Sequence, residues 1–82
     1  MDHFVYPVIS LIRTGKNISF LMEQSHLRVK DLQEVFAFEH PQAIYKWLRG
    51  DSLPSIDNLV VLSQLFDVPI DRILVIDEMG KK

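Results

Sequence analysis

A short segment of the chain, residues 41–50, combines side chains that can recognise DNA with signals for a helix. Pro41 suits the first turn of a helix, because its φ is preset and the N–H that it lacks would have no partner there. Gly50 suits the other end, since glycine adopts the left-handed conformation that ends many helices. The segment is therefore predicted to form a helix over residues 41–49.

One stripe of this helix is apolar, because Ile44, Trp47 and Leu48 stand at positions i, i+3 and i+4. The remaining side chains are expected to face outward: Gln42, Ala43, Tyr45, Lys46 and Arg49. Glutamine can bond adenine through two hydrogen bonds, a methyl group can contact thymine, and lysine and arginine reach guanine or phosphate. We expect the outward face to lie in the major groove of double-stranded DNA.

The composition limits the classes of protein to consider. A chain of 82 residues with 48% apolar residues is one small domain with a hydrophobic core. It has no cysteine, and His3, His26 and His40 lack the spacing of metal ligands, so we expect no metal and no cofactor. The apolar run over residues 4–12 is too short to span a bilayer. We expect a cytoplasmic, nucleoid-associated protein with no membrane segment.

No residue pattern indicates catalysis. Neither a Ser-His-Asp arrangement nor a pair of carboxylates can be argued from the spacing. The chain has only three glycines, too few for a phosphate-binding loop. We therefore expect a protein that is not an enzyme and has no small-molecule substrate.

The charge is distributed unevenly along the chain. The net charge is -2, which disfavours contact with DNA. Residues 13–50 nevertheless carry six Lys or Arg against four Asp or Glu, whereas residues 51–82 carry three against six, and Asp2 adds one more negative charge. A basic half facing the duplex and an acidic half facing away would reconcile the net charge with DNA binding.

The apolar spacing predicts four further helices. Thr14 is the expected N-cap of the first, which ends near Ser25 or His26. The second is expected over residues 28–36, and the fourth between Ser55 and Asp67. Pro69 is expected to begin a short fifth helix.

Three of these helices have an expected inward stripe. In the first helix it consists of Ile18, Leu21 and Met22. In the second it consists of Val29, Leu32, Val35 and Phe36. In the fourth it consists of Ile56, Leu59, Val60, Leu62, Ser63 and Phe66. The expected fold is all-α, a compact five-helix bundle.

The expected organisation is an N-terminal apolar arm over residues 1–13, a helical domain over residues 14–76 and a flexible tail over residues 77–82. Residues 4–9 and 73–76 are rich in β-branched and aromatic side chains. Segments this short fit paired strands, extended helices or a dimer contact equally well.

The chain resembles the Xre-type, lambda-repressor-like helix-turn-helix domains of bacterial and phage regulators. The resemblance rests on Ile44-x-Lys46-Trp47-x-Arg49-Gly50, followed by Leu53-Pro54-Ser55, and it covers about 60 of the 82 residues. Further matches are Leu27, Leu32, Asn58-Leu59, Leu62, Phe66-x-Val68 and Ile73-Leu74. The resemblance implies a helix-turn-helix DNA-binding fold that acts in transcription regulation.

The resemblance also implies roles for individual residues. The third helix would be the recognition helix, with Gln42, Ala43, Tyr45 and Lys46 at base edges or the adjoining backbone. Phosphate contacts would come from five other residues: Lys16, Arg28, Lys30, Arg49 and Asn58. Regulators of this kind place two recognition helices about 34 Å apart, so we expect a homodimer. The dimer surface is expected on the fifth helix with the apolar N-terminal or C-terminal segment.

Several positions differ from the family pattern. Glycines that commonly end the first and second helices are replaced by His26 and Ala37, and a common glutamine is replaced by Val29. Phe20 and Met22 stand where polar or basic residues are usual, and with Leu48 they would form exposed apolar groups. The alternative function is therefore a protein-interaction or antitoxin-like module on the same fold, with weak or no DNA binding.

Overall fold

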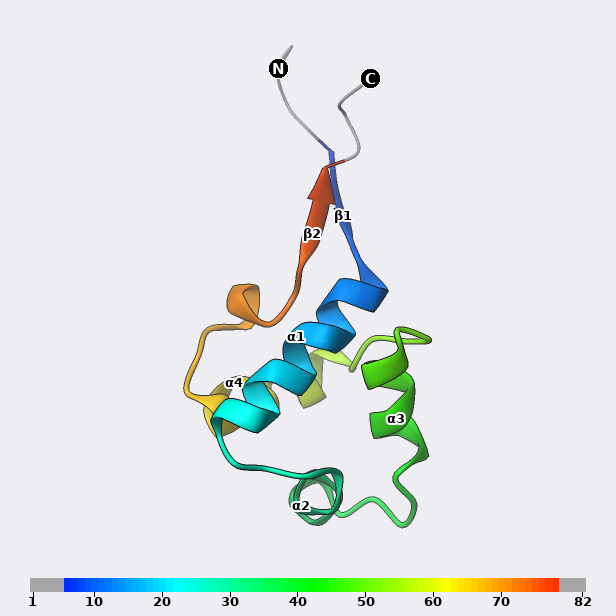
Figure 1. Ribbon diagram of the computed structural model, residues 1–82, viewed down its shortest axis with the longest axis vertical. Coiled ribbons are helices and arrows are strands. Elements are labelled where there is room, and N and C mark those ends of the chain that lie inside the picture. The colour runs from blue at the N-terminus through cyan, green and yellow to red at the C-terminus, as the bar shows by residue number, and fades with distance from the viewer. Residues whose placement is uncertain (1–5, 79–82) are drawn as a thin grey trace.

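The computed structural model describes residues 6–78, which form four α-helices and a two-stranded antiparallel ribbon (Figure 1). In chain order the elements are β1 (Pro7–Ile9), α1 (Leu11–Gln24), α2 (Val29–Phe36), α3 (Gln42–Arg49), α4 (Ile56–Phe66), the 3-10 turn η1 (Ile70–Arg72) and β2 (Ile76–Glu78). Helix α1 crosses the body of the domain, with α3 on one side and α4 behind it. The predicted count of five α-helices is therefore wrong, whereas the predicted all-α class fits this mostly helical domain.

Helix α1 begins one turn earlier than predicted. Its N-cap is Ser10, whose Oγ accepts a hydrogen bond from the backbone N–H of Arg13 at 3.1 Å. Thr14, the predicted N-cap, is buried inside the helix, and its Oγ1 accepts a hydrogen bond from the N–H of Val75 at 2.9 Å. The prediction failed because Thr14 bonds to a residue 61 positions away in the sequence.

Helices α2 and α3 are joined by a tight turn. Ala37 ends α2 in the left-handed conformation at φ 56° and ψ 36°, at the position where the resemblance implied a glycine. Helix α3 begins at Gln42, one residue later than predicted, with Pro41 at the N-cap position. Gly50 ends it in the left-handed conformation, at φ 83°, which confirms the predicted end of the helix.

Helix α4 has both predicted ends, because Ser55 Oγ accepts a hydrogen bond from the N–H of Asn58 and Asp67 is the C-cap. The expected fifth helix is only the single 3-10 turn η1. The chain cannot extend this turn because the next residues bond to the start of α1. The N–H of Val75 donates to Thr14, and its carbonyl accepts from the N–H of Ser10 at 2.8 Å.

The ribbon joins the two ends of the described chain. Strand β1 pairs antiparallel with β2, with Val8 opposite Asp77 and Ile9 opposite Ile76. Of the two segments in question, Pro7–Ile9 and Ile76 are therefore observed in paired strands, whereas residues 73–75 form the end of η1 and its connection to β2. The Arg13 guanidinium donates to the Asp77 carboxylate at 2.6 Å, which ties the ribbon to α1. Residues 1–5 of the predicted arm and 79–82 of the predicted tail lie outside the described residues.

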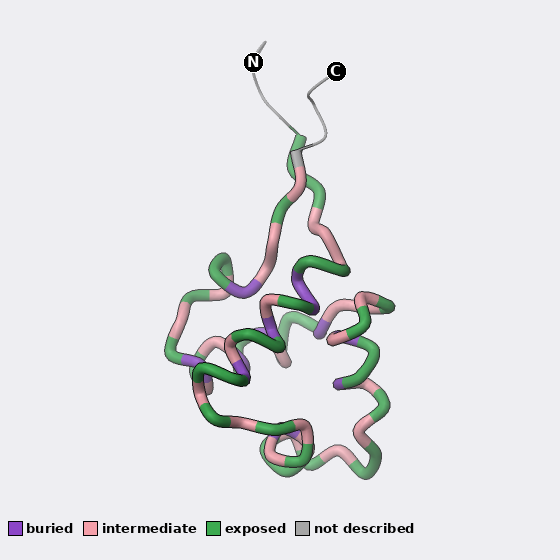
Figure 2. Tube along the Cα trace, viewed as in Figure 1, coloured by how far each residue is buried: buried purple, intermediate pink, exposed green. Residues whose placement is uncertain are grey.

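The hydrophobic core lies among the four helices and η1 (Figure 2). Its buried members are Ile18, Met22, Leu32, Ile44, Trp47, Leu59, Leu62, Phe66 and Ile73. Three predicted core residues are exposed instead: Val35, Ile56 and Val60. Helix α4 is apolar on most sides, so its spacing does not reveal which side faces the core. Within residues 6–78, no helix has the length and apolar character needed to cross a membrane.

The left-handed conformation of Ala37 leads to a stability prediction. An L-residue pays about 1–2 kcal/mol in this region, whereas glycine pays little. Ala37→Gly is therefore expected to raise the free energy of unfolding by about 1 kcal/mol in urea denaturation, after the greater freedom of glycine in the unfolded chain is counted. Ala43→Gly is the control, because Ala43 lies within α3, where glycine is expected to lower stability by about 1 kcal/mol. A destabilised Ala37→Gly would contradict the prediction.

Candidate nucleic-acid interface

Helix α3 is held against α1 at a very short separation. A Cβ atom built on Gly15 of α1 would lie 2.8 Å from the carbonyl oxygen of Leu48 and still closer to that of Trp47. At the end of α3, a Cβ on Gly50 would lie 2.8 Å from the Cα of Ile12. The two glycines therefore fix the distance between α3 and α1, and with it the position of the exposed face of α3.

Three aromatic rings pack together where α2, the α2–α3 turn and α3 meet. Trp47 is buried, and Phe36 and Phe38 meet it edge-on at centroid distances of 5.5 and 6.1 Å. These two phenylalanines are stacked on each other at 5.1 Å. Since Phe36 ends α2 and Phe38 lies in the turn, the cluster ties the α2–α3 turn to the helix that follows it.

The exposed face of α3 carries four of the five side chains that were expected to face outward. Gln42, Tyr45, Lys46 and Arg49 are exposed and line one shallow hollow. Ala43 differs, because it is half-buried and packs against the core. The expectation that Ala43 faces outward is therefore only partly correct, because part of its side chain contacts the core. The hollow presents one amide, one phenol and two cations.

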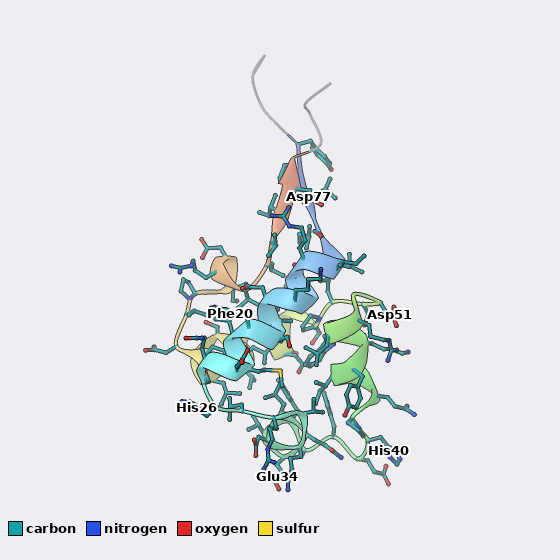
Figure 3. The ribbon with its side chains drawn as sticks, viewed as in Figure 1. Phe20, His26, Glu34, His40, Asp51 and Asp77 are labelled. Atoms are coloured by element: carbon teal, nitrogen blue, oxygen red, sulfur yellow. The ribbon has the colours of Figure 1, made fainter. Side chains whose placement is uncertain are left out.

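Arg49 has a partner within the chain. Its Nε donates to Asp51 Oδ2 at 2.9 Å, and its Nη2 lies 2.8 Å from the same oxygen. Asp51 follows the left-handed Gly50, just beyond the end of α3 (Figure 3). Asp51 is not predicted from the sequence as a partner of Arg49, because a spacing of two residues does not bring side chains together on a helix. The order Arg-Gly-Asp at a predicted helix end was the available signal.

The residues expected at phosphates are spread over four helices, with Arg49 on α3 and the others on α1, α2 and α4. Arg28 is the N-cap of α2 and Lys30 lies in its first turn, and both side chains are exposed. The Asp31 carboxylate accepts a hydrogen bond from the backbone N–H of Arg28 at 2.8 Å. Lys16 is exposed on α1. Asn58 is half-buried in the first turn of α4, where its N–H donates to Ser55.

A helix-turn-helix family model matches residues 18–73, more than half of the chain. The chain belongs to the Xre-type, lambda-repressor-like helix-turn-helix family. The family binds DNA, so the domain is a DNA-binding helix-turn-helix domain. No curated protein and no solved structure matches the chain. In this helix-turn-helix the two helices of the motif are α2 and α3, and the four exposed side chains lie on the second of them.

Two of the three apolar residues that suggested a protein partner are not exposed in this helix-turn-helix domain. Met22 is buried in the core, and Leu48 is half-buried against it. The prediction that they are exposed is wrong for Met22 because the stripe of α1 continues through it. Phe20 is 54% exposed (Figure 3). Met22, Leu27, Val29 and Leu48 also line an open groove formed by the end of α1, the start of α2 and Leu48 of α3.

Metal-ligating side chains do not gather in the part of the helix-turn-helix domain that the structure describes. No group of three or more His, Cys, Asp or Glu residues there could hold a metal ion.

Proposed function

We propose that the protein is a transcriptional regulator that binds specific sequences in double-stranded DNA, with α3 in the major groove. The observation that carries this proposal is the shared hollow of Gln42, Tyr45, Lys46 and Arg49 on the exposed face of α3. A helix of eight residues fits the major groove, and these side chain types bond base edges and phosphates.

Each side chain of α3 has a proposed role that follows from its chemistry. Gln42, in the first turn, bonds an adenine edge, and Lys46, one turn later on the same side, bonds guanine or the adjoining backbone. Tyr45 packs beside the sugar-phosphate backbone. Ala43, half-buried, contacts a thymine methyl with the part of its surface that remains exposed.

The proposed phosphate contacts come from all four helices. They are Lys16, Arg28, Lys30, Arg49 and Asn58. Four are exposed cations, and the fifth is the half-buried amide of Asn58. Because the chain has a net charge of -2, we expect weak binding to unrelated DNA that falls steeply with salt.

The test of this function is the selection of bound duplexes from a randomised pool at about 150 mM salt, where non-specific binding is weak. We expect the bound duplexes to be enriched in one sequence motif, arranged as two inverted half-sites. A folded protein that enriches no motif would contradict the proposal.

We further propose that the protein binds DNA as a homodimer joined through the ribbon. Reading two successive major grooves requires two copies with recognition helices about 34 Å apart. The structure changes the expected dimer surface, because η1 offers only one turn in place of a fifth helix. Val8 and Ile76 are exposed apolar side chains on opposite faces of the ribbon, and Tyr6 just before β1 is a third. Isolated two-stranded ribbons are marginally stable without further packing. A second copy of the ribbon would supply that packing.

This dimer is tested by substituting Ile76, which is 51% exposed. Ile76→Lys is expected to weaken self-association by about tenfold or more, since a charge then replaces an apolar contact. Val60→Lys is the matched control on α4, also an exposed aliphatic residue, and is expected to leave the association unchanged. The measurement is sedimentation equilibrium. A monomeric wild type at tens of micromolar, or equal effects of both variants, would contradict the proposal.

The open groove favours one second function, a protein-interaction module on the same fold. Its apolar lining of Met22, Leu27, Val29 and Leu48 would accept a partner's apolar side chain. Retention on heparin distinguishes the two functions, because a basic face that binds DNA also binds this polyanion. A folded protein that flows through heparin and selects no duplex would support the interaction module.

A further inference from the structure

We propose that Asp51 is a positioning residue for DNA recognition, which orients Arg49 and weakens binding to unrelated DNA. The proposal rests on the DNA-binding function proposed above and concerns the last turn of the same helix. Three observations support it. The backbone of Asp51 is fixed, its carboxylate contacts one edge of Arg49, and a carboxylate is unfavourable at the C-terminal end of a helix.

The backbone of Asp51 is fixed by the cap of α3. Its N–H donates to the carbonyl of Lys46 at 2.9 Å, and the N–H of Gly50 donates to the carbonyl of Trp47 at 3.2 Å. These two bonds form a Schellman motif, which requires the left-handed conformation of Gly50 at φ 83°. The backbone of Asp51 is therefore held next to the end of α3, from where its carboxylate reaches Arg49.

The contact occupies one edge of the Arg49 guanidinium. Nε and Nη2 both approach Asp51 Oδ2, at 2.9 and 2.8 Å. A guanidinium has five N–H donors in a plane, so the donors of Nη1 and the second donor of Nη2 remain available. Asp51 thus leaves Arg49 with a second edge of fixed direction, suited to a bidentate contact with guanine or phosphate.

Stability does not account for the placement of Asp51. A carboxylate next to the C-terminal end of a helix faces the negative end of the helix dipole, where Lys46 and Arg49 are favourable and an acid is not. Both side chains of the pair are more than half exposed, and exposed ion pairs contribute little to folding. Residues that break a local rule in this way are expected where function requires them.

Two consequences for DNA binding follow from this geometry. Paired with Asp51, Arg49 adds little net charge at the interface, so it contributes little to the salt-dependent attraction to any duplex. At the correct sequence its orientation is already set, so less side-chain freedom is lost on binding. Asp51 should therefore raise the ratio of affinity for the selected duplex to affinity for an unrelated duplex.

The test compares Asp51→Asn and Asp51→Ala with Asp71→Asn in the otherwise unchanged protein. Asp71 lies in η1, on the far side of α1 from α3, and its substitution makes the same change in net charge (Figure 1). Dissociation constants are measured for the selected duplex and an unrelated duplex over a range of salt concentrations. Thermal unfolding establishes that each variant is folded.

Both Asp51 variants are expected to bind the unrelated duplex about three- to fivefold more tightly, and the dependence of this binding on salt is expected to steepen by about 0.9 in slope. The ratio of affinity for the selected duplex to affinity for the unrelated duplex is expected to fall. Asp71→Asn is expected to change none of these. In an Arg49→Ala background the ratio should no longer respond to Asp51, which separates positioning from charge alone.

Two other outcomes would overturn the inference in different ways. If the wild type selects a motif and the Asp51 variants keep its affinity ratio, the inference fails while the proposed function stands. If the folded wild type binds no duplex, the proposed function fails and the inference fails with it.

Discussion

Gly15→Ala is expected to lower the free energy of unfolding by about 2 kcal/mol, because overpacking costs about 3 kcal/mol at the upper end of its usual range and the helix preference of alanine offsets about 1 kcal/mol. The new Cβ would lie 2.8 Å from the carbonyl oxygen of Leu48 and closer still to that of Trp47. Both are backbone atoms of α3, so neither can rotate away as a flexible side chain would. Alanine gains about 1 kcal/mol over glycine in a helix, which offsets only part of the clash. Urea denaturation measures the difference.

The control for this prediction is Ser19→Ala, an exposed position of the same helix, which is expected to change stability by about 0.5 kcal/mol or less. The clash can be relieved only by moving α3 away from α1, because the obstructing atoms belong to the backbone of α3. Gly15→Ala is therefore also expected to weaken DNA binding under conditions in which it remains folded. A variant as stable as the wild type would show that the two helices are not held at this separation.

The elements predicted correctly from the sequence have local signals. Gly50 ends α3 because glycine adopts its left-handed conformation, and Ser55 begins α4 through its own hydroxyl. The errors arise where distant residues decide the outcome. Thr14 has the chemistry of an N-cap, but it bonds to Val75, and the same contact prevents η1 from becoming a fifth helix. Neither partner is near the other in the sequence, so no local pattern reveals the contact.

The candidate site follows the same rule. The helical spacing predicted that Gln42, Tyr45, Lys46 and Arg49 face outward, and all four are exposed. The spacing did not predict the pairing of Arg49 with Asp51, because that contact depends on how the chain turns at Gly50. Helical periodicity describes side chains within α3 and ends where the helix ends.

Gln42→Ala is expected to reduce affinity for the selected duplex by about 1–3 kcal/mol and to relax selectivity at one base position only. Gln42 is exposed in the first turn of α3, where a recognition helix meets base edges. Its amide can donate to and accept from adenine at once, and alanine can do neither. Fluorescence anisotropy with the selected duplex and its single-base variants measures both the loss and the position at which selectivity disappears.

Two control substitutions are compared with Gln42→Ala. One removes a charge from α3, and the other removes a glutamine amide from a different helix. Lys46→Ala is expected to weaken binding to every duplex and to reduce the salt slope by about 1, because it removes a cation rather than an amide. Gln64→Ala removes the same amide from an exposed position of α4 and is expected to have no effect. If Gln42→Ala keeps the selected motif unchanged, or alters it no more than Gln64→Ala, α3 does not recognise bases through Gln42. The origin of specificity would then have to be sought in Lys46 and in Arg49, oriented by Asp51.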